Sequence, residues 1–358
     1  MQYVKQDFFD QFVCSADKCP DNCCHEGWQI VVDDDTLDRF RNYEGPLKEK
    51  IIKGVDFEEG LIKFGCDGKC TMLREDGLCE MVLEMGEESL CDTCHLYPRH
   101  VEEFDGIREW SISVSCPLVA KMTIEKEEKA TFVEYSDDLP DPLEDDFDDF
   151  DYILFDRLEE SRPKIYKVLT DSELSIEDRI AIVIDYSERL QECLDNDSLF
   201  EMDEIIPLIS ITESDKFSIY EFAKNHGRVF KMLERLRKDW DEYLGYFEDA
   251  MMLSEQEFSN RYSKYVESYG KARHDKMLEN LLMSLIFTYY LGAVYDDMIK
   301  SKIMLTVFIA VMIDVITFGA SLSGKIADIE LFEEVTYKLA REIEHSDENL
   351  NSIEDYFA

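Results

Sequence analysis

Basic residues are scarce in this sequence: 38 Lys and Arg stand against 81 Asp and Glu, which gives a formal net charge of -43. Nucleic-acid binding depends on lysine and arginine side chains that neutralise backbone phosphates. The shortage therefore argues against a DNA or RNA partner, and against an anionic membrane surface for the same reason. The acidic excess would attract a lysine-rich protein, although the same acidity also serves solubility alone.

Several cofactor-binding motifs are missing as well. No Gly-x-Gly-x-x-Gly follows a strand-like run, so nothing supports a Rossmann turn. A P-loop-like run at 319–325 is followed by Ile326 instead of Ser or Thr, and it ends a helical pattern, so we discard it. Cys19 and Cys23 begin the Cys-x3-Cys-x2-Cys triplet of radical S-adenosylmethionine clusters, but Glu26 stands at the third position and the match fails.

A secretory leader is not visible, because residues 1–7 lack a basic stretch followed by an apolar one. We therefore expect a cytoplasmic protein. The apolar run Ile303–Leu322 has about the 20 residues needed to cross a bilayer, but Asp314 lies near its middle, where a charge is costly. This run predicts a helix buried on all sides in a helical domain, and no membrane partner.

Cysteine, in contrast, is abundant: the chain has eleven, and ten of them precede residue 120. In a reducing cytoplasm such density favours thiolate–metal bonds over disulfides. Soft sulfur ligands select zinc, Cu(I) or iron–sulfur clusters, and spacing alone leaves zinc and a cubane cluster both open. The adjacent pair Cys23 and Cys24 is unusual for a zinc finger, and the thiols outnumber the needs of one zinc, so both details lean toward iron.

Composition divides the chain into three parts. Residues 1–130 predict an irregular cysteine-rich metal-binding domain with short strands, such as 28–32 and 110–114. Residues 131–152 form an acidic linker that includes Pro140 and Pro142. Residues 153–358 place apolar side chains at three- and four-residue steps, which predicts a multi-helix domain and a mainly α fold. The clearest periodic segments are 176–194 (with Ser175 as its cap), 217–246, 255–269, 274–295 and 331–343.

The helical part contains isolated side chains that we interpret as structural or surface residues: Cys193, which is expected as a buried thiol, and His226, His274 and His345. Three other histidines lie near the cysteines and can ligate or tune a metal, although a surface position is the better interpretation of each: His25, His95 and His100.

Four cysteine motifs follow one another along the first third of the chain. They are 14–28 with 31–33, the Cys–Leu–Asp/Gly–Cys run 70–79, the Thr-Cys-x-x-Tyr-Pro-Arg element within 90–99, and the Ser-Cys-Pro-x-x-Ala element 115–120. Taken in this order, the motifs resemble the flagellin lysine-N-methylase family. The similarity covers roughly residues 8–122 and extends more loosely to cysteine-cluster proteins that chelate zinc or iron.

This resemblance implies a [4Fe–4S] cluster, S-adenosylmethionine, and methyl transfer to surface lysines of flagellin. In the broader group the protein would instead chelate zinc or iron without catalysis, or serve as a redox or electron-transfer module; zinc is the alternative metal. Cys66 and Cys91 fall outside the family pattern. The cysteines that match the family's ligand positions are Cys14, Cys19, Cys23, Cys24, Cys70, Cys79, Cys94 and Cys116.

A lysine methylase has to aim the donor methyl group at the acceptor nitrogen and to remove a proton, since an ammonium is not a nucleophile. Tyr97 and Arg99 follow Cys94 closely and are our candidate catalytic residues, Tyr97 to line the site and Arg99 to pair with a carboxylate. They fit equally well a structural role in fixing the chain beyond Cys94. Three further neighbours of the thiolates can assist: Glu26, His95 and His100.

Overall fold

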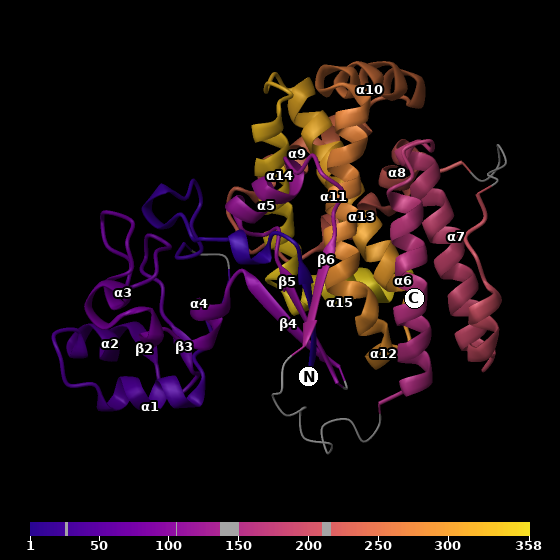
Figure 1. Cartoon of the computed structure of the whole chain (residues 1–358). Helices are drawn as coiled ribbons and strands as arrows, with labels where there is room; N and C mark the ends of the chain where they lie inside the picture. The colour runs from indigo at the N-terminus through magenta and orange to yellow at the C-terminus, as the bar shows by residue number, and fades with distance from the viewer. Residues whose placement is uncertain (26–27, 105, 137–149, 210–215) are drawn as a thin grey trace.

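A computed structural model describes residues 1–25, 28–104, 106–136, 150–209 and 216–358. Helices dominate these residues, which confirms the predicted mainly α class (Figure 1). The helices are α1 Asp34–Asn42, α2 Lys48–Gly54, α3 Glu80–Met85, α4 Asp92–Leu96, α5 Pro117–Ile124, α6 Tyr152–Leu169, α7 Ile176–Asp195, α8 Ile219–Met232, α9 Trp240–Met251, α10 Glu255–Tyr269, α11 Lys271–Tyr289, α12 Ala293–Asp296, α13 Ile299–Leu322, α14 Ile329–Glu344 and α15 Asp347–Phe357. The strands are β1 Gln2–Gln6, β2 Val55–Asp56, β3 Leu61–Ile62, β4 Arg99–Phe104, β5 Ile107–Ile112 and β6 Phe132–Ser136.

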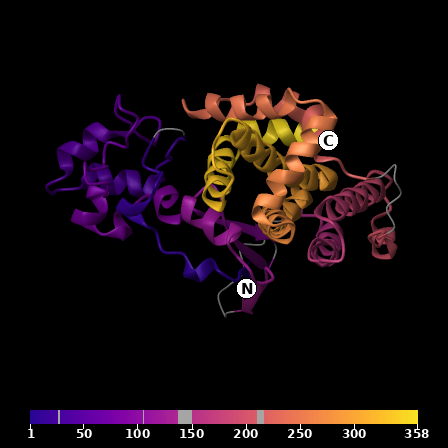
Figure 2. The same ribbon diagram turned by 90° about the horizontal axis from the view of Figure 1, so that it is seen from above.

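Buried apolar side chains form two separate cores. The smaller core gathers Ile30, Phe40, Ile51 and Met72 with their neighbours. It lies inside residues 13–96, which we call the cysteine lobe, and this lobe projects from one side of the helices in both views (Figures 1 and 2). The larger core belongs to the rest of the chain, which we call the main body.

A four-stranded sheet, in the order β4-β5-β1-β6, belongs to the main body. Strand β1 runs parallel to β5 and antiparallel to β6, and the rings of Tyr3 and Tyr135 stack across the second pair at 4.7 Å. Phe9, Ile112 and Val119 are buried in the same core as the helices, and α5 packs against α11 and α14. Residues 1–12 and 97–136 therefore contribute to the main body, so the division between the two cores does not coincide with the expected domain limit at residue 130.

The predicted acidic linker, 131–152, contains regular structure at both ends. Residues 132–136 form β6, and α6 begins at Tyr152 with the Asp151 carboxylate accepting from two backbone amides. Residues 137–149, with Pro140 and Pro142, lie outside the described residues. The expected strand at 110–114 overlaps β5. The expected strand at 28–32 is reduced to an isolated bridge between Val31 and Leu61, flanked by backbone hydrogen bonds of Ile30 and Val32.

Most of the periodic segments are helices at the predicted places. The Ser175 side chain caps α7 by accepting from the Asp178 amide, as its position predicts. The segment 217–246 is instead divided into α8 and α9 by residues 233–239. There the amide of Leu236 donates to the Glu342 carboxylate at 2.8 Å, so the chain is held against α14 instead of continuing its own helix.

Helix α13 runs through the centre of the main body and packs against α7, α9, α11, α14 and α15. Two helical segments, Lys271–Asp296 and Ile299–Leu322, are long and apolar enough to cross a membrane by length and composition, a test that buried core helices also pass. The apolar window of the second is 100% buried, which agrees with the predicted core helix. Its Asp314 carboxylate accepts from Tyr262 and Tyr265 and lies 2.8 Å from the His274 ring.

Candidate functional site

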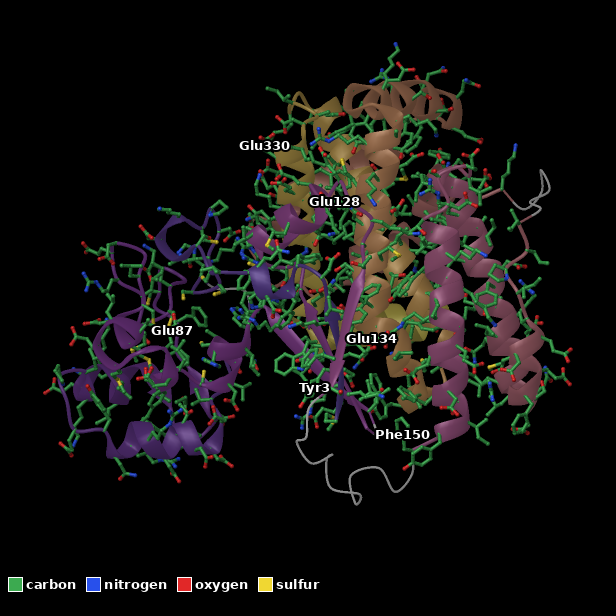
Figure 3. All side chains as sticks on the ribbon, viewed as in Figure 1. Tyr3, Glu87, Glu128, Glu134, Phe150 and Glu330 are labelled. Carbon is green, nitrogen blue, oxygen red and sulfur yellow. The ribbon has the colours of Figure 1, made fainter. Side chains whose placement is uncertain are left out.

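The cysteine lobe brings thiols from three stretches of chain into one region (Figure 3 shows sulfur atoms gathered in the lobe that carries the labelled Glu87). The amide of Cys70 donates to the Cys24 carbonyl at 2.7 Å, which joins the first stretch to the second. A tight turn then pairs Leu73 with Cys79, so that Cys70 and Cys79 lie at the two ends of one small loop. The backbone thus places three predicted ligands side by side.

Hydrogen bonds between thiols identify two pairs within this region. The hydrogen bond between Cys23 and Cys24 lowers the pKa of Cys23 and raises that of Cys24. The hydrogen bond between Cys91 and Cys94 likewise lowers the pKa of Cys91 and raises that of Cys94. The charges of Cys23 and Cys24 also raise the pKa of Cys94, and burial raises that of Cys70 to about 11. These five thiols therefore share one electrostatic environment.

The remaining cysteines differ in their surroundings. Cys116 is the residue before α5, and burial raises the pKa of its thiol to about 11, with the charges of Cys19 and Cys23 adding to that effect. Because Cys116 belongs to the main body, the predicted ligands come from both sides of the junction. Cys14 and Cys66 are exposed, and Cys193 is buried in α7 as expected.

All eleven cysteines are free thiols. Within the described ranges, no three His, Cys, Asp or Glu side chains are grouped as a metal site, so the eight ligands stay a prediction. The chemistry of these side chains fits a thiolate-bound metal, because the set is rich in soft sulfur ligands. Two pairs of its thiols are also close enough to form hydrogen bonds. Cys91 lies outside the family pattern, yet it is buried against Cys94, whereas Cys66 is exposed.

Tyr97 lies at the junction between lobe and body. Its ring packs against Trp28 at 5.0 Å and against His345 at 5.5 Å, and its hydroxyl lies 3.1 Å from the Ser115 hydroxyl. Burial raises the pKa of Tyr97 far above its usual value.

Arg99 lies on β4, away from that group. Its guanidinium lies over the rings of Phe9 and Phe12 and reaches the Phe12 carbonyl at 3.5 Å. These contacts hold the sheet to the chain before the lobe. His100, one residue on, pairs with Glu102 at 3.1 Å on the exposed face of β4.

Two nearby histidines and one acid had also been candidates. His25 forms an isolated bridge with Lys69 in the lobe, and His95 is exposed in α4. Glu26 lies outside the described residues.

A cavity lies at the junction of the lobe and the main body. It measures about 220 Å³ including its opening to solvent, and its walls come from the lobe, from the segment before α9 and from the end of α14. Its lining residues are Asn22, Cys23, His25, Trp28, Arg237, Arg341 and His345. The cysteine motifs of the sequence indicate the lobe side of this cavity. They give no sign of Arg237 and Arg341, because these residues belong to no motif and look like ordinary charged residues of a helical domain.

Positive charge is concentrated beside this cavity. The Asp21 carboxylate, 7% exposed, lies 3.0 Å from Arg237, 2.8 Å from Lys338 and 3.1 Å from Arg341. Burial alone would raise the pKa of Asp21, but Arg341 and Lys338 outweigh it and lower the pKa. Asp239 pairs with Arg237 and Lys338 as well, so three cations meet two carboxylates. The charge of Arg341 in this cluster also favours the ionised forms of the Cys19 and Cys23 thiols.

Comparisons with known proteins bear on both parts of the chain. A family model described as the FliB lysine N-methylase C-terminal domain matches residues 162–358, more than half of the chain. The flagellar biosynthetic protein FliU of Salmonella muenchen is 30% identical over 120 residues, which are 31% of this chain and 70% of that protein.

Two proteins named lysine-N-methylase, from Salmonella typhimurium strain LT2 and Salmonella choleraesuis strain SC-B67, are also 30% identical over 120 residues. These matches cover 31% of this chain but 30% of each relative, so less than a third of either lysine-N-methylase is represented. No solved structure matches the chain.

Proposed function

The chain belongs to the FliB lysine N-methylase family, and from that premise we propose that it methylates the ε-amine of lysine side chains on a flagellar protein, with flagellin as the substrate. The observation that supports this proposal most directly is the junction cavity. Its walls combine Cys23, from the thiol-rich lobe, with Arg341 and His345, which lie in the part of the chain that matches the family model.

We propose that the thiols hold a [4Fe–4S] cluster, with zinc as the alternative metal, and that S-adenosylmethionine donates the methyl group. When bound, the cluster would supply an iron that chelates the donor's amino and carboxylate groups. The ligands would come from the eight family-type cysteines. Cys91 is a further candidate, because its thiol forms a hydrogen bond with that of Cys94. The positive charge of Arg341 would stabilise the negative charge of metal-bound thiolates at Cys19 and Cys23.

The protein's own side chains would position the donor. Arg237 and Arg341 line the cavity and can pair with a carboxylate in the planar geometry that guanidinium groups favour. Trp28 supplies an aromatic wall. Tyr97 does not line the cavity itself, but it packs against two residues that do, so its proposed role is to position Trp28 and His345.

The proposal is tested in two stages. Anaerobically purified protein is analysed for iron, acid-labile sulfide and zinc; we expect iron and sulfide in comparable amounts, and stoichiometric zinc without sulfide would contradict the cluster. The loaded protein is then incubated with flagellin, S-adenosylmethionine and a reductant, and lysine peptides are examined by mass spectrometry. We expect mass increments of one methyl group on lysine peptides. If the metal-loaded protein leaves every lysine unmodified, the methylase proposal is wrong and the protein is a metal chelator without this activity.

A further inference from the structure

A chain of hydrogen bonds leads from the cavity to the carboxyl group of Glu344. His345, which lines the cavity, places Nε2 3.1 Å from the Ser115 hydroxyl. Ser115 Oγ lies 2.6 Å from Ser113 Oγ, and Ser113 in turn donates to Glu344 Oε2. The four residues come from the loop between β5 and α5 and from the end of α14, segments 231 residues apart in sequence.

The bonding partners fix the direction of this chain. An ionised carboxylate only accepts, so the Ser113 hydroxyl gives its proton to Glu344. Ser113 Oγ then accepts from both the amide of Ser115, at 3.0 Å, and the hydroxyl of Ser115. With its own proton committed, Ser115 Oγ accepts from His345 Nε2 and from the Tyr97 hydroxyl. Every donor therefore points from the cavity toward Glu344.

We propose that His345, Ser115, Ser113 and Glu344 form a proton relay that removes a proton from the substrate ammonium group in the cavity. This inference rests on the proposed lysine methylation, because an ammonium has to lose a proton before its nitrogen can attack a methyl group. In the relay, His345 Nδ1 takes the ammonium proton while Nε2 releases its own to Ser115. Ser115 passes its proton to Ser113, Ser113 passes its proton to Glu344, and the free amine and a neutral carboxylic acid result.

The electrostatics of the two ends agree with these roles. Burial, with Arg341 and Arg237, lowers the pKa of His345 to about 3, so the ring passes a proton without retaining it. Burial raises the pKa of Glu344 to about 7, which suits a group that accepts and releases a proton near neutral pH.

The groups that face Glu344 come from three elements. Ser113 in the loop after β5 and Tyr289 of α11 both donate to it, and the charge of His100 on β4 favours its ionised form.

Ser113 offers a matched test. Ser113→Ala interrupts the relay and should lower the methylation rate at neutral pH by about 100-fold, within the usual range for general acid–base catalysis. Ser113→Thr keeps a hydroxyl at the same place and should restore most of the rate. Ser111→Ala, in β5 two residues before Ser113, removes a buried hydroxyl that has no partner among the described residues, and it should leave the rate unchanged. Equal rates for the Ala and Thr variants at Ser113 would overturn the relay.

Glu344→Gln tests the acceptor end. The wild-type rate should rise as the pH increases through about 7, because only ionised Glu344 can accept the proton, and this rise should disappear in Glu344→Gln. A readout independent of activity is the infrared band of a protonated carboxyl group, which should titrate across neutral pH in the wild type and be missing from the variant. If no such band titrates, the relay is wrong even where methylation is observed. If the band titrates but the loaded wild type methylates no lysine, the proposed function fails instead.

Discussion

Arg341 binds Asp21 at both its backbone and its side chain, across 320 residues of sequence. Nη2 donates to the Asp21 carbonyl at 2.6 Å, and Nη1 lies 3.1 Å from the carboxylate. The same guanidinium donates from Nε to the Ser115 carbonyl at 2.8 Å. One side chain of α14 therefore ties the start of the cysteine lobe to the loop before α5, at the edge of the proposed site.

Asp21→Asn should destabilise the protein substantially. The substitution removes the negative charge from among Arg237, Lys338 and Arg341, and breaking a buried ion pair in this way typically costs about 3–5 kcal/mol of unfolding free energy. Because those cations lower the pKa of Asp21 below 3.8, its stabilisation is present above that value and is lost as the pH falls through the folded-state pKa.

Urea unfolding at neutral pH measures this effect. Asp38→Asn is the control, since Asp38 and its partner Arg41 have side chains 72% and 48% exposed and such a pair contributes about 0–1 kcal/mol. Equal losses for the two variants would show that the Asp21 cluster does not hold the lobe to the body.

The buried pair of His274 and Asp314 should make stability depend on pH. Burial alone would lower the pKa of His274, but Asp314 outweighs it and raises the pKa to about 9 from an unfolded value of 6.5. The stabilisation is therefore complete below pH 6.5 and is lost as the pH rises through about 9. The loss amounts to about 3 kcal/mol for a shift of this size.

Unfolding free energies of the wild type and of His274→Gln across this range test the point. Their difference should shrink as the pH rises, and a difference that stays constant would mean that His274 is neutral in the folded protein.

Metal content should respond to individual cysteines according to their place in the structure. Cys24→Ser and Cys94→Ser each remove a thiol that bonds to another thiol in the lobe, and both should lower bound iron and sulfide severely. Cys66→Ser, at an exposed position, and Cys193→Ser, in the α7 core, are the controls and should retain full loading. Cys91→Ser should reduce the bound iron although the family pattern omits this residue. An iron content equal to that of the wild type would show that Cys91 has only a structural role.

Two glycines on facing helices should respond in opposite directions to alanine. A Cβ at Gly319 in α13 would come within 1.9 Å of the Tyr246 carbonyl oxygen, whereas one at Gly245 in α9 would meet nothing within 4 Å. Gly319→Ala should lower the unfolding free energy by at least about 1–3 kcal/mol through overpacking. Gly245→Ala should raise it by about 0.5–1 kcal/mol, because alanine is the better helix former. Thermal unfolding of both variants decides, and a stable Gly319→Ala would show that α9 and α13 separate easily.

Sequence reasoning performed best where structure depends on near neighbours. The α7 helix and its Ser175 cap are local features, and both were predictable. The break between α8 and α9 was not, because it depends on bonds from Leu236 to Glu342 and from Glu234 to Asn349, more than 100 residues away. Periodicity contains no information about such partners.

The candidate site shows the same limit. Dense cysteines and their motifs marked the lobe side, because soft ligands at short spacing are visible in any sequence. The sequence alone indicates an isolated structural or surface role for His345, because its partner Ser115 lies 230 positions away along the chain. The run 319–325 resembles a phosphate loop in its two glycines and its lysine, but the close approach of α9 explains the first glycine.

Strand β1 precedes the cysteine lobe along the chain, and this order bears on synthesis. Its hydrogen-bonding partners are β5 and β6, so the first strand stays unpaired until residue 107 and beyond have been made. At ~5–20 residues per second, that wait lasts about 5–20 seconds. The whole cysteine lobe is synthesised within the same interval, before the helices of the main body and the partners of Asp21 in α14 have been made. A nascent chain thus completes the cysteine lobe while the junction between the lobe and the main body is still open.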